Sequence, residues 1–228
     1  MERLFRVITR RLKRRLVIAS VAFWVPVLIF IKLADDVRDN DALLLDRPIT
    51  DFVQSFTSDS LTWLAKLLTH GGDLWFILLV LAVVSVYLFR KNRQRDFLAV
   101  LFSVGGAGFI SFLLKLLFQR ERPSLELALV SETTFSFPSG HSMGSAALGL
   151  ILIIMFWRSR YRWLVFAVSS FYIVIVGLTR VYLGAHYPSD VVAAWCLSAA
   201  WVLVVYIALE HPASVKRYLQ KLHHKLPF

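Results

Sequence analysis

The sequence predicts an all-α membrane protein, a single bundle of six transmembrane helices with both termini in the cytoplasm. Hydrophobic residues make up 57% of the 228 residues and charged residues only 18%, which is too apolar for an ordinary soluble domain. The apolar residues gather into six segments, each near the length that crosses a bilayer core of about 30 Å. Basic clusters mark alternate connections between these segments, a pattern typical of polytopic membrane proteins.

The six apolar segments are residues 16–34, 73–89, 96–118, 142–157, 163–181 and 189–209. In lipid the backbone must bond its own polar groups, and these runs lack the short alternation of barrel strands, so we expect helices. Six spans of about 20 residues leave little chain for a second domain. We therefore predict one domain over residues 1–228. Cys196 is the only cysteine, so no intrachain disulfide can form.

Charge predicts the orientation of the spans. Basic residues cluster within residues 1–15, 90–95, 158–162 and 216–225, whereas the connection after the first segment is acidic, from Asp35 to Asp59. The positive-inside rule then predicts a basic cytoplasmic tail at residues 1–15 and outward connections after the first, third and fifth segments. Because the basic residues flank hydrophobic stretches, membrane topology explains the net charge of +11 better than nucleic-acid binding does, and we expect no nucleic-acid partner.

Two features of the N-terminal part allow alternative interpretations. Residues 1–34 could be a signal peptide, but the apolar run is long for one and Leu33-Ala34-Asp35 is a poor cleavage site, so we expect a retained anchor. In the outer connection, residues 35–72, apolar residues from Ile49 to Leu68 recur near helical spacing. This spacing predicts either a helix lying on the outer leaflet or a loop packed over the bundle.

The first cluster of residues suited to binding or catalysis is Lys115-x6-Arg122-Pro123, at the outer end of the third segment. A spacing of seven places both cations on one helix face if the helix persists, although Pro123 disfavours helical geometry at Arg122. Both cations could then point into one phosphate site. The alternative is that Lys115 and Arg120 extend to the membrane surface to keep their charges in water.

The second cluster is Pro138-Ser139-Gly140-His141, directly before the fourth segment. A helix N-terminus presents free backbone amides to an anion, and Gly140 lets the anion approach them closely. Ser139 can add a hydroxyl donor, and His141 can deliver a proton to a leaving oxygen near neutral pH. The alternative is an ordinary capping serine beside an interfacial histidine.

The third cluster is Arg180-x5-His186-x3-Asp190, between the fifth and sixth segments. A neutral His186 can attack phosphorus if a carboxylate such as Asp190 orients its ring. The alternative is that Asp190 only offsets the helix dipole and Arg180 extends to the surface. All three clusters nevertheless fall on the same predicted side of the membrane. Ionisable residues at the ends of spans are costly to place there, so we interpret them as parts of a functional site.

These clusters resemble the motifs K-x6-R-P, P-S-G-H and S-R-x5-H-x3-D of the type 2 phosphatidic acid phosphatase and vanadium haloperoxidase superfamily. The resemblance covers the latter half of the chain, and Thr179 replaces the usual serine. It implies no metal and no cofactor. It also implies a role for each matching residue. His186 would be the nucleophile, Asp190 its partner, and His141 the acid that protonates the leaving group. The phosphate would be bound by Lys115, Arg122, Ser139, Gly140 and Arg180.

The resemblance and the membrane context together predict a phosphatase of the bacterial plasma membrane that cleaves a lipid phosphate at the periplasmic or exterior face through a phosphohistidine. Undecaprenyl diphosphate, phosphatidic acid and phosphatidylglycerol phosphate are the expected substrates, and we favour the first. Phosphoryl transfer to a second lipid would use the same residues. The spans argue against vanadate-dependent oxidation, and their scarcity of ionisable residues argues against a six-helix transporter. The sequence predicts no oligomeric state.

Overall fold

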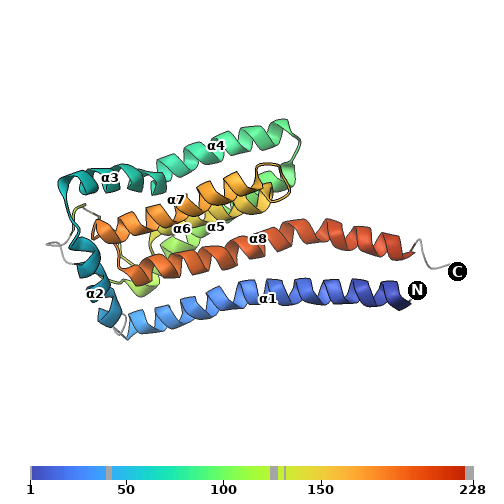
Figure 1. Cartoon of the computed structure of the whole chain (residues 1–228), viewed down its shortest axis with the longest axis horizontal. Helices are drawn as coiled ribbons and strands as arrows, with labels where there is room; N and C mark the ends of the chain where they lie inside the picture. The colour runs from blue at the N-terminus through green and yellow to red at the C-terminus, as the bar shows by residue number, and fades with distance from the viewer. Residues whose placement is uncertain (1, 40–42, 124–127, 131, 224–228) are drawn as a thin grey trace.

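The computed structural model describes residues 2–39, 43–123, 128–130 and 132–223, and all regular structure within them is helical, as predicted (Figure 1). The elements in chain order are α1 (Glu2–Arg38), α2 (Leu43–Gln54), α3 (Asp59–Thr69), the 3-10 helix η1 (His70–Gly72), α4 (Leu74–Arg90), α5 (Gln94–Phe118), α6 (Gly140–Phe156), α7 (Arg162–Tyr182) and α8 (Pro188–His223).

Each of the six apolar segments lies within or largely within one helix, namely α1, α4, α5, α6, α7 and α8. Within the residues that the structure describes, four stretches are long and apolar enough to cross a membrane: Val17–Arg38, Gln94–Phe118, Arg162–Tyr182 and Pro188–Leu209. A fifth is added if Asp59–Gly72 and Leu74–Arg90, which meet at 49°, count as one broken span. The chain is an integral membrane protein, whereas the count of six spans and the cytoplasmic termini stay predictions.

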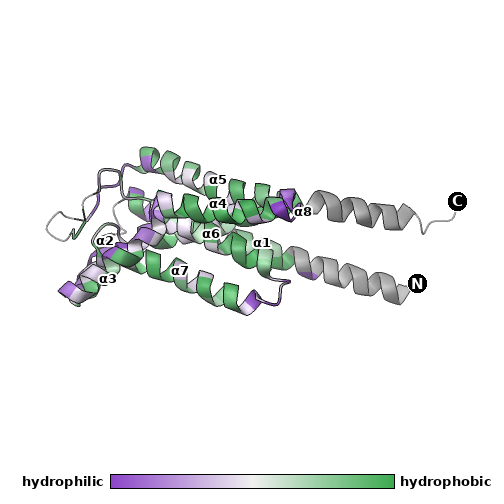
Figure 2. Ribbon diagram, turned by 90° about the horizontal axis from the view of Figure 1, so that it is seen from above, coloured by the Kyte–Doolittle hydropathy of each residue, from purple (hydrophilic) through white to green (hydrophobic). Residues whose placement is uncertain are grey.

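Helix α6 forms the centre of the bundle and packs against α5, α7 and α8. Small residues let its neighbours approach: a Cβ added to Gly144 would lie 2.7 Å from Ile77 Cδ1, and one added to Gly149 would lie 2.8 Å from Ile173 Cδ1. Hydrophobic residues cover the sides of the helices, while hydrophilic residues gather toward the ends (Figure 2). This distribution suits a bundle whose sides face lipid.

Helices α2 and α3 lie at the end of the bundle away from the two chain termini, where α2 packs obliquely against α7 and α8, and α3 runs alongside α7 and packs against it (Figure 1). The apolar stretch 49–68 therefore forms two helices instead of the single helix or the loop that we expected. The break occurs at residues 55–58, where Ser55 and Thr57 donate their hydroxyls to backbone carbonyls and Ser58 caps α3. Such side-chain bonds compete with the helix ladder and favour its termination.

Candidate active site

His186 lies in the short connection between α7 and α8, and its side chain is buried. The N–H groups of Ala185 and His186 both donate to the carbonyl of Arg180, at 3.0 and 3.2 Å. The turn requires the left-handed φ of 65° at Gly184, a conformation that glycine adopts without steric penalty. These backbone bonds hold the candidate nucleophile between the end of α7 and the start of α8.

Asp190 holds the His186 ring in a defined orientation. Helix α8 begins at Pro188, so Asp190 lies in its first turn, where Oδ2 accepts from the Tyr187 N–H at 2.9 Å and lies 3.3 Å from His186 Nδ1. This contact favours the tautomer with its proton on Nδ1 and leaves the lone pair on Nε2. Arg122 Nη1 lies 3.4 Å from that Nε2.

Burial lowers the pKa of His186 to about 3, although the hydrogen bond and charge of Asp190 act in the opposite direction. Desolvation disfavours the charged form of an imidazole, and here it outweighs the carboxylate. The ring is therefore neutral at pH 7. Only a neutral imidazole has a lone pair with which to attack phosphorus.

A second layer of buried polar residues surrounds Asp190, and sequence reasoning missed it. Ser136 donates its hydroxyl to Asp190 Oδ2, and Arg120 donates from Nη1 to Asp190 Oδ1. The other Nη of Arg120 donates to Asp46 Oδ2 at 2.6 Å, and Asp46 Oδ1 accepts from the Ser189 N–H at 2.9 Å. The interpretation of Arg120 as a residue extending to the membrane surface is wrong, because its side chain is only 8% exposed and joins two carboxylates.

Lys115 and Arg122 do approach the same site, but not from one helix face. Helix α5 ends at Phe118, and Gln119 adopts a left-handed conformation with φ of 44°, so Arg122 belongs to the following loop. Arg122 donates from Nε to the Thr134 carbonyl and from Nη1 to the Ala185 carbonyl, both at 2.6 Å. The persistent helix that would have aligned these cations is thus absent, and backbone carbonyls orient Arg122 instead.

The N-terminus of α6 stands beside Lys115. A Cβ added at Gly140 would lie 3.9 Å from Lys115 Cε, and Lys115 Nζ donates to the Phe135 carbonyl. Ser139 caps the helix, accepting from the Ser142 N–H at 3.4 Å and from its hydroxyl at 3.0 Å. Free backbone amides of a helix N-terminus therefore lie next to a lysine, as an anion site requires.

Arg180 is buried near the end of α7, where Nη1 donates to Thr69 Oγ1 at 2.9 Å and Nη2 pairs with the Glu132 carboxylate. The other Glu132 oxygen lies 3.7 Å from Arg122 Nη2, so one carboxylate bridges two of the predicted phosphate-binding cations. Although burial acts to raise it, the Arg180 guanidinium holds the pKa of the Glu132 carboxyl below its ordinary value. Glu132 is therefore an internal anion at the candidate phosphate site.

His141 has a carboxylate partner from a distant part of the chain. Its Nε2 lies 2.8 Å from Asp73 Oδ1, and His70 Nδ1 lies 2.7 Å from the other oxygen of Asp73. A Cβ added at Gly72 would lie 2.8 Å from His141 Cβ, so the absence of a side chain there permits this approach. Asp73 can fix the tautomer and orientation of His141 in the way that Asp190 does for His186.

The structure brings all eight sequence-predicted residues to one end of the bundle. Arg122 contacts His186, and Glu132 links Arg122 to Arg180, which interacts electrostatically with His141. Lys115 interacts electrostatically with both Arg122 and Arg180. The catalytic and phosphate-binding roles of these residues stay predictions. The partners that sequence reasoning missed are Asp46, Asp73, Arg120, Glu132 and Ser136.

Comparison with known proteins identifies a family and several relatives of this chain. Residues 96–211 match the sequence profile of the PAP2 superfamily. Phosphatidylglycerophosphatase B of Bacillus subtilis is 28% identical over 199 residues, which are 85% of this chain and 96% of the relative. Lipid A 1-phosphatase of Rhizobium johnstonii is 33% identical, with 72% of this chain and 73% of the relative covered. A crystal structure of a transmembrane PAP2-type phosphatidylglycerolphosphate phosphatase from Bacillus subtilis superposes with a TM-score of 0.75 at 27% identity, covering 81% and 94% of the two chains.

Proposed function

Because the chain belongs to the PAP2 superfamily of membrane lipid phosphatases, we propose that it hydrolyses a lipid phosphate through a phosphohistidine formed on Nε2 of His186. One observation carries the proposal: a buried, neutral histidine has Nδ1 directed to Asp190 and its unprotonated Nε2 within 3.4 Å of Arg122 Nη1. This is the arrangement that an in-line attack on a phosphoryl group needs.

In the first step Nε2 of His186 attacks phosphorus, a P–N bond forms, and the bond to the departing oxygen breaks while His141 protonates that oxygen. In the second step water attacks the phosphorus, His141 takes a proton from the water, and the P–N bond breaks to release phosphate. Lys115, Arg122 and Arg180, with the amides at the start of α6, stabilise the charge on the transferred phosphoryl oxygens. Asp190 stabilises the cationic imidazole of the intermediate.

Phosphatidylglycerol phosphate is the substrate that the name of one relative supports, since the relative covered over 96% of its length is a phosphatidylglycerophosphatase. Undecaprenyl diphosphate and phosphatidic acid are the other candidates, because each is a membrane lipid that carries a terminal phosphate, in the first as part of a diphosphate and in the second as a monoester. We place the site at the periplasmic or exterior face of a bacterial plasma membrane. The basic connections at the opposite ends of the spans support this orientation.

The test is phosphate release by the purified protein in detergent from these three lipids and from a soluble phosphate ester. We expect His186→Ala to lower kcat by about 10⁶-fold and Asp190→Asn to lower it by about 10⁴-fold, because one removes the nucleophile and the other only its orienting partner. Both variants should keep the wild-type elution profile. Normal release by His186→Ala, or release from the soluble ester alone, contradicts the proposal. A phosphorylated lipid product in place of free phosphate would indicate transfer instead of hydrolysis.

A further inference from the structure

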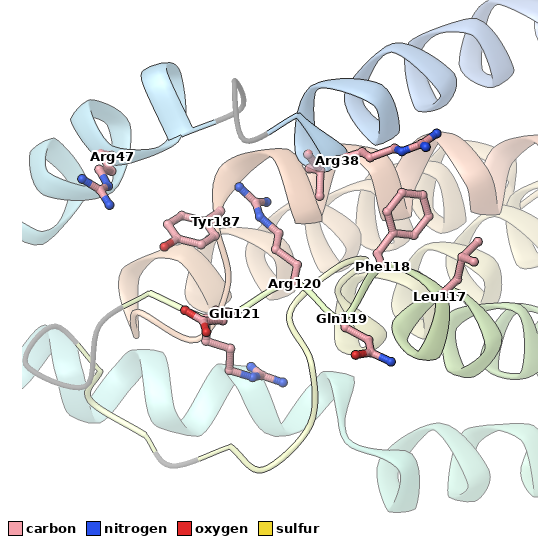
Figure 3. Close-up of a pocket in the computed structure, with 10 residues that line it drawn as sticks. Arg38, Arg47, Leu117, Phe118, Gln119, Arg120, Glu121 and Tyr187 are labelled. Carbon is pink, nitrogen blue, oxygen red and sulfur yellow. The ribbon is translucent and has the colours of Figure 1, made fainter.

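The two histidines of the candidate site are supported by different parts of the chain. A cavity of about 930 Å³ adjoins the His186 side, where Arg120 and Tyr187 line it between the end of α1, helix α2 and the loop after α5 (Figure 3). Asp73 and His141 do not line this cavity. They meet where α6 packs against η1. The support of His141 therefore comes from a separate part of the fold.

Asp73 binds two histidines in place of capping a helix. It occupies the N-cap position of α4, where an aspartate ordinarily bonds the first free amides. Its side chain forms no such bond with α4, a helix that the structure describes throughout. Instead Oδ1 accepts from His141 Nε2 at 2.8 Å and Oδ2 accepts from His70 Nδ1 at 2.7 Å. Both carboxylate oxygens thus serve imidazole rings.

The 3-10 helix η1 fixes the position of Asp73. Tyr172 of α7 donates its hydroxyl to the Gly71 carbonyl at 2.6 Å. A Cβ added at Gly72 would lie 2.8 Å from His141 Cδ2, so a side chain there would push η1 away from α6. The break between α3 and α4 is therefore held against α6 and α7. The carboxylate that follows it directly can then reach His141.

The same contacts determine which nitrogen of His141 is available to a substrate. Its Nε2 donates to Asp73, and its Cδ2 edge faces Gly72. Its Nδ1, on the opposite edge of the ring, donates to no residue that the structure describes. Arg180 and Glu132 of the candidate phosphate site both interact electrostatically with this ring. Nδ1 is thus the nitrogen that remains for a leaving group.

From this arrangement we infer that Asp73 is a positioning residue of the proposed reaction, which holds His141 so that Nδ1 protonates the departing oxygen. The inference rests on the proposed function and deepens it. In the first step the Nδ1–H bond breaks and the proton passes to the oxygen that leaves phosphorus, while the Nε2 proton stays bonded to Asp73. In the second step Nδ1 takes a proton from the attacking water, which restores the starting state. Asp73 stays a carboxylate throughout and stabilises the cationic ring.

The family resemblance does not assign this role, because Asp73 precedes residues 96–211, the part of the chain that matches the family. The alternative is that Asp73 only joins η1 to α6. A carboxylate in that role would matter equally for every substrate. A partner of the acid matters only where the leaving group needs a proton. The chemistry of the leaving group therefore separates the two roles.

The experiment compares kcat/KM for two kinds of phosphate ester. One is phosphatidic acid or phosphatidylglycerol phosphate, whichever the wild-type protein hydrolyses faster, since both release an alkoxide that must be protonated. The other is a nitrophenyl phosphate that carries a long alkyl chain, because nitrophenolate leaves without a proton. We expect Asp73→Asn to lower kcat/KM for the lipid by about 10²-fold and for the nitrophenyl ester by less than about threefold.

A second readout comes from the hydrolysis of the phosphohistidine. The ratio kcat/KM reports only the steps up to departure of the leaving group, whereas His141 acts again when water attacks. In Asp73→Asn we therefore expect an initial burst of nitrophenolate, followed by a slower steady rate as the phosphohistidine accumulates. The burst also shows that the site of the variant is folded.

Two further variants serve as controls. Asp59→Asn removes an exposed carboxylate from the first turn of α3 and should leave both kcat/KM values at the wild-type level. The double variant Asp73→Asn/His141→Asn should lose no more kcat/KM for the lipid than His141→Asn alone, because Asp73 acts through His141.

An equal fall of kcat/KM for both leaving groups, or no fall for either, would overturn the role of Asp73 while the phosphatase proposal stands. A double variant whose loss is the product of the two single losses would also overturn it. If the wild-type protein hydrolyses neither lipid that releases an alkoxide, the acid has no such group to protonate and the inference fails. If it releases no phosphate from any lipid, the proposed function itself fails.

Discussion

At the scale of single residues, the candidate site depends on buried charge that is almost fully paired. Asp190 has no exposed surface and receives bonds from Ser136, Arg120 and the Tyr187 N–H besides facing His186. A buried carboxylate requires this number of donors, because an unpaired charge in the interior is strongly destabilising. The same donors orient Asp190 toward His186, where the proposed mechanism needs a carboxylate to stabilise a cationic imidazole.

Glu132 leads to a prediction about inhibition by the product. Its carboxylate bridges Arg180 and Arg122 and therefore competes with an anion for the same two cations. We expect Glu132→Gln to tighten binding of inorganic phosphate by about tenfold, the equivalent of ~1.4 kcal/mol. The inhibition constant of phosphate in the lipid phosphatase assay measures this change.

The control for that measurement is Asp59→Asn, which removes an exposed carboxylate in the first turn of α3. It should not alter the inhibition constant. Weaker phosphate inhibition in Glu132→Gln would mean that the carboxylate holds the arginines in place instead of competing with the anion. That result would contradict the prediction.

The sequence indicated residues that the structure brings together at one end of the bundle, because histidine, arginine and the P-S-G-H segment stand at the ends of apolar runs. Their chemical roles stay predictions. The sequence could not indicate their partners. Asp73 contacts a histidine 68 positions away, and Asp46 contacts an arginine 74 positions away. The stretch from Asp35 to Asp73 contains several aspartates that look alike in sequence, and only tertiary packing brings Asp46 to Arg120 and Asp73 to His141.

At the scale of helices, the position of α2 depends on Asp46, which joins it to α8 through Ser189 and to the loop after α5 through Arg120. Both side chains of the Asp46–Arg120 pair are under 10% exposed. We expect Asp46→Asn to lower the free energy of unfolding by about 3 kcal/mol, because it leaves a buried guanidinium short of a counter-charge. Thermal unfolding in detergent measures the loss.

A matched variant on the same helix is Asp51→Asn, since Asp51 is exposed. A surface substitution of this kind should change stability by no more than about 0.5 kcal/mol. Asp46→Asn should in addition lower kcat, because Arg120 also contacts Asp190. Equal melting temperatures for the two variants would show that the Asp46–Arg120 pair does not hold α2.

Helix positions were predictable wherever apolar length decided them, as in α5, α7 and α8. The end of α5 could not be predicted, because the residue in the left-handed conformation is Gln119, and a glutamine side chain gives no signal that a helix ends. The break between α2 and α3 follows from local serine and threonine bonds, which become evident only when their carbonyl partners are known.

At the scale of the whole molecule, the orientation in the membrane leads to a labelling prediction. Ser60 on α3 lies toward the proposed outer end, and Lys91 lies between α4 and α5, in a basic connection; both are exposed. In a Cys196→Ser background, we expect a membrane-impermeant maleimide to label Ser60→Cys in intact cells and Lys91→Cys only after lysis, as the positive-inside rule requires. The reverse pattern would place the site in the cytoplasm.

The turn between α7 and α8 bears on how the site forms as the chain folds. The Arg180 carbonyl, the two N–H groups that bond to it and the Asp190 carboxylate all lie within residues 180–190. Contacts this close in sequence form quickly, because little chain entropy is lost in closing them. The candidate nucleophile and its carboxylate therefore take shape once these two helices associate, whereas Arg120, Arg122 and His141 join only on assembly of the full bundle. A helical hairpin grafted with this segment would inherit the histidine–aspartate pair without the ability to bind phosphate.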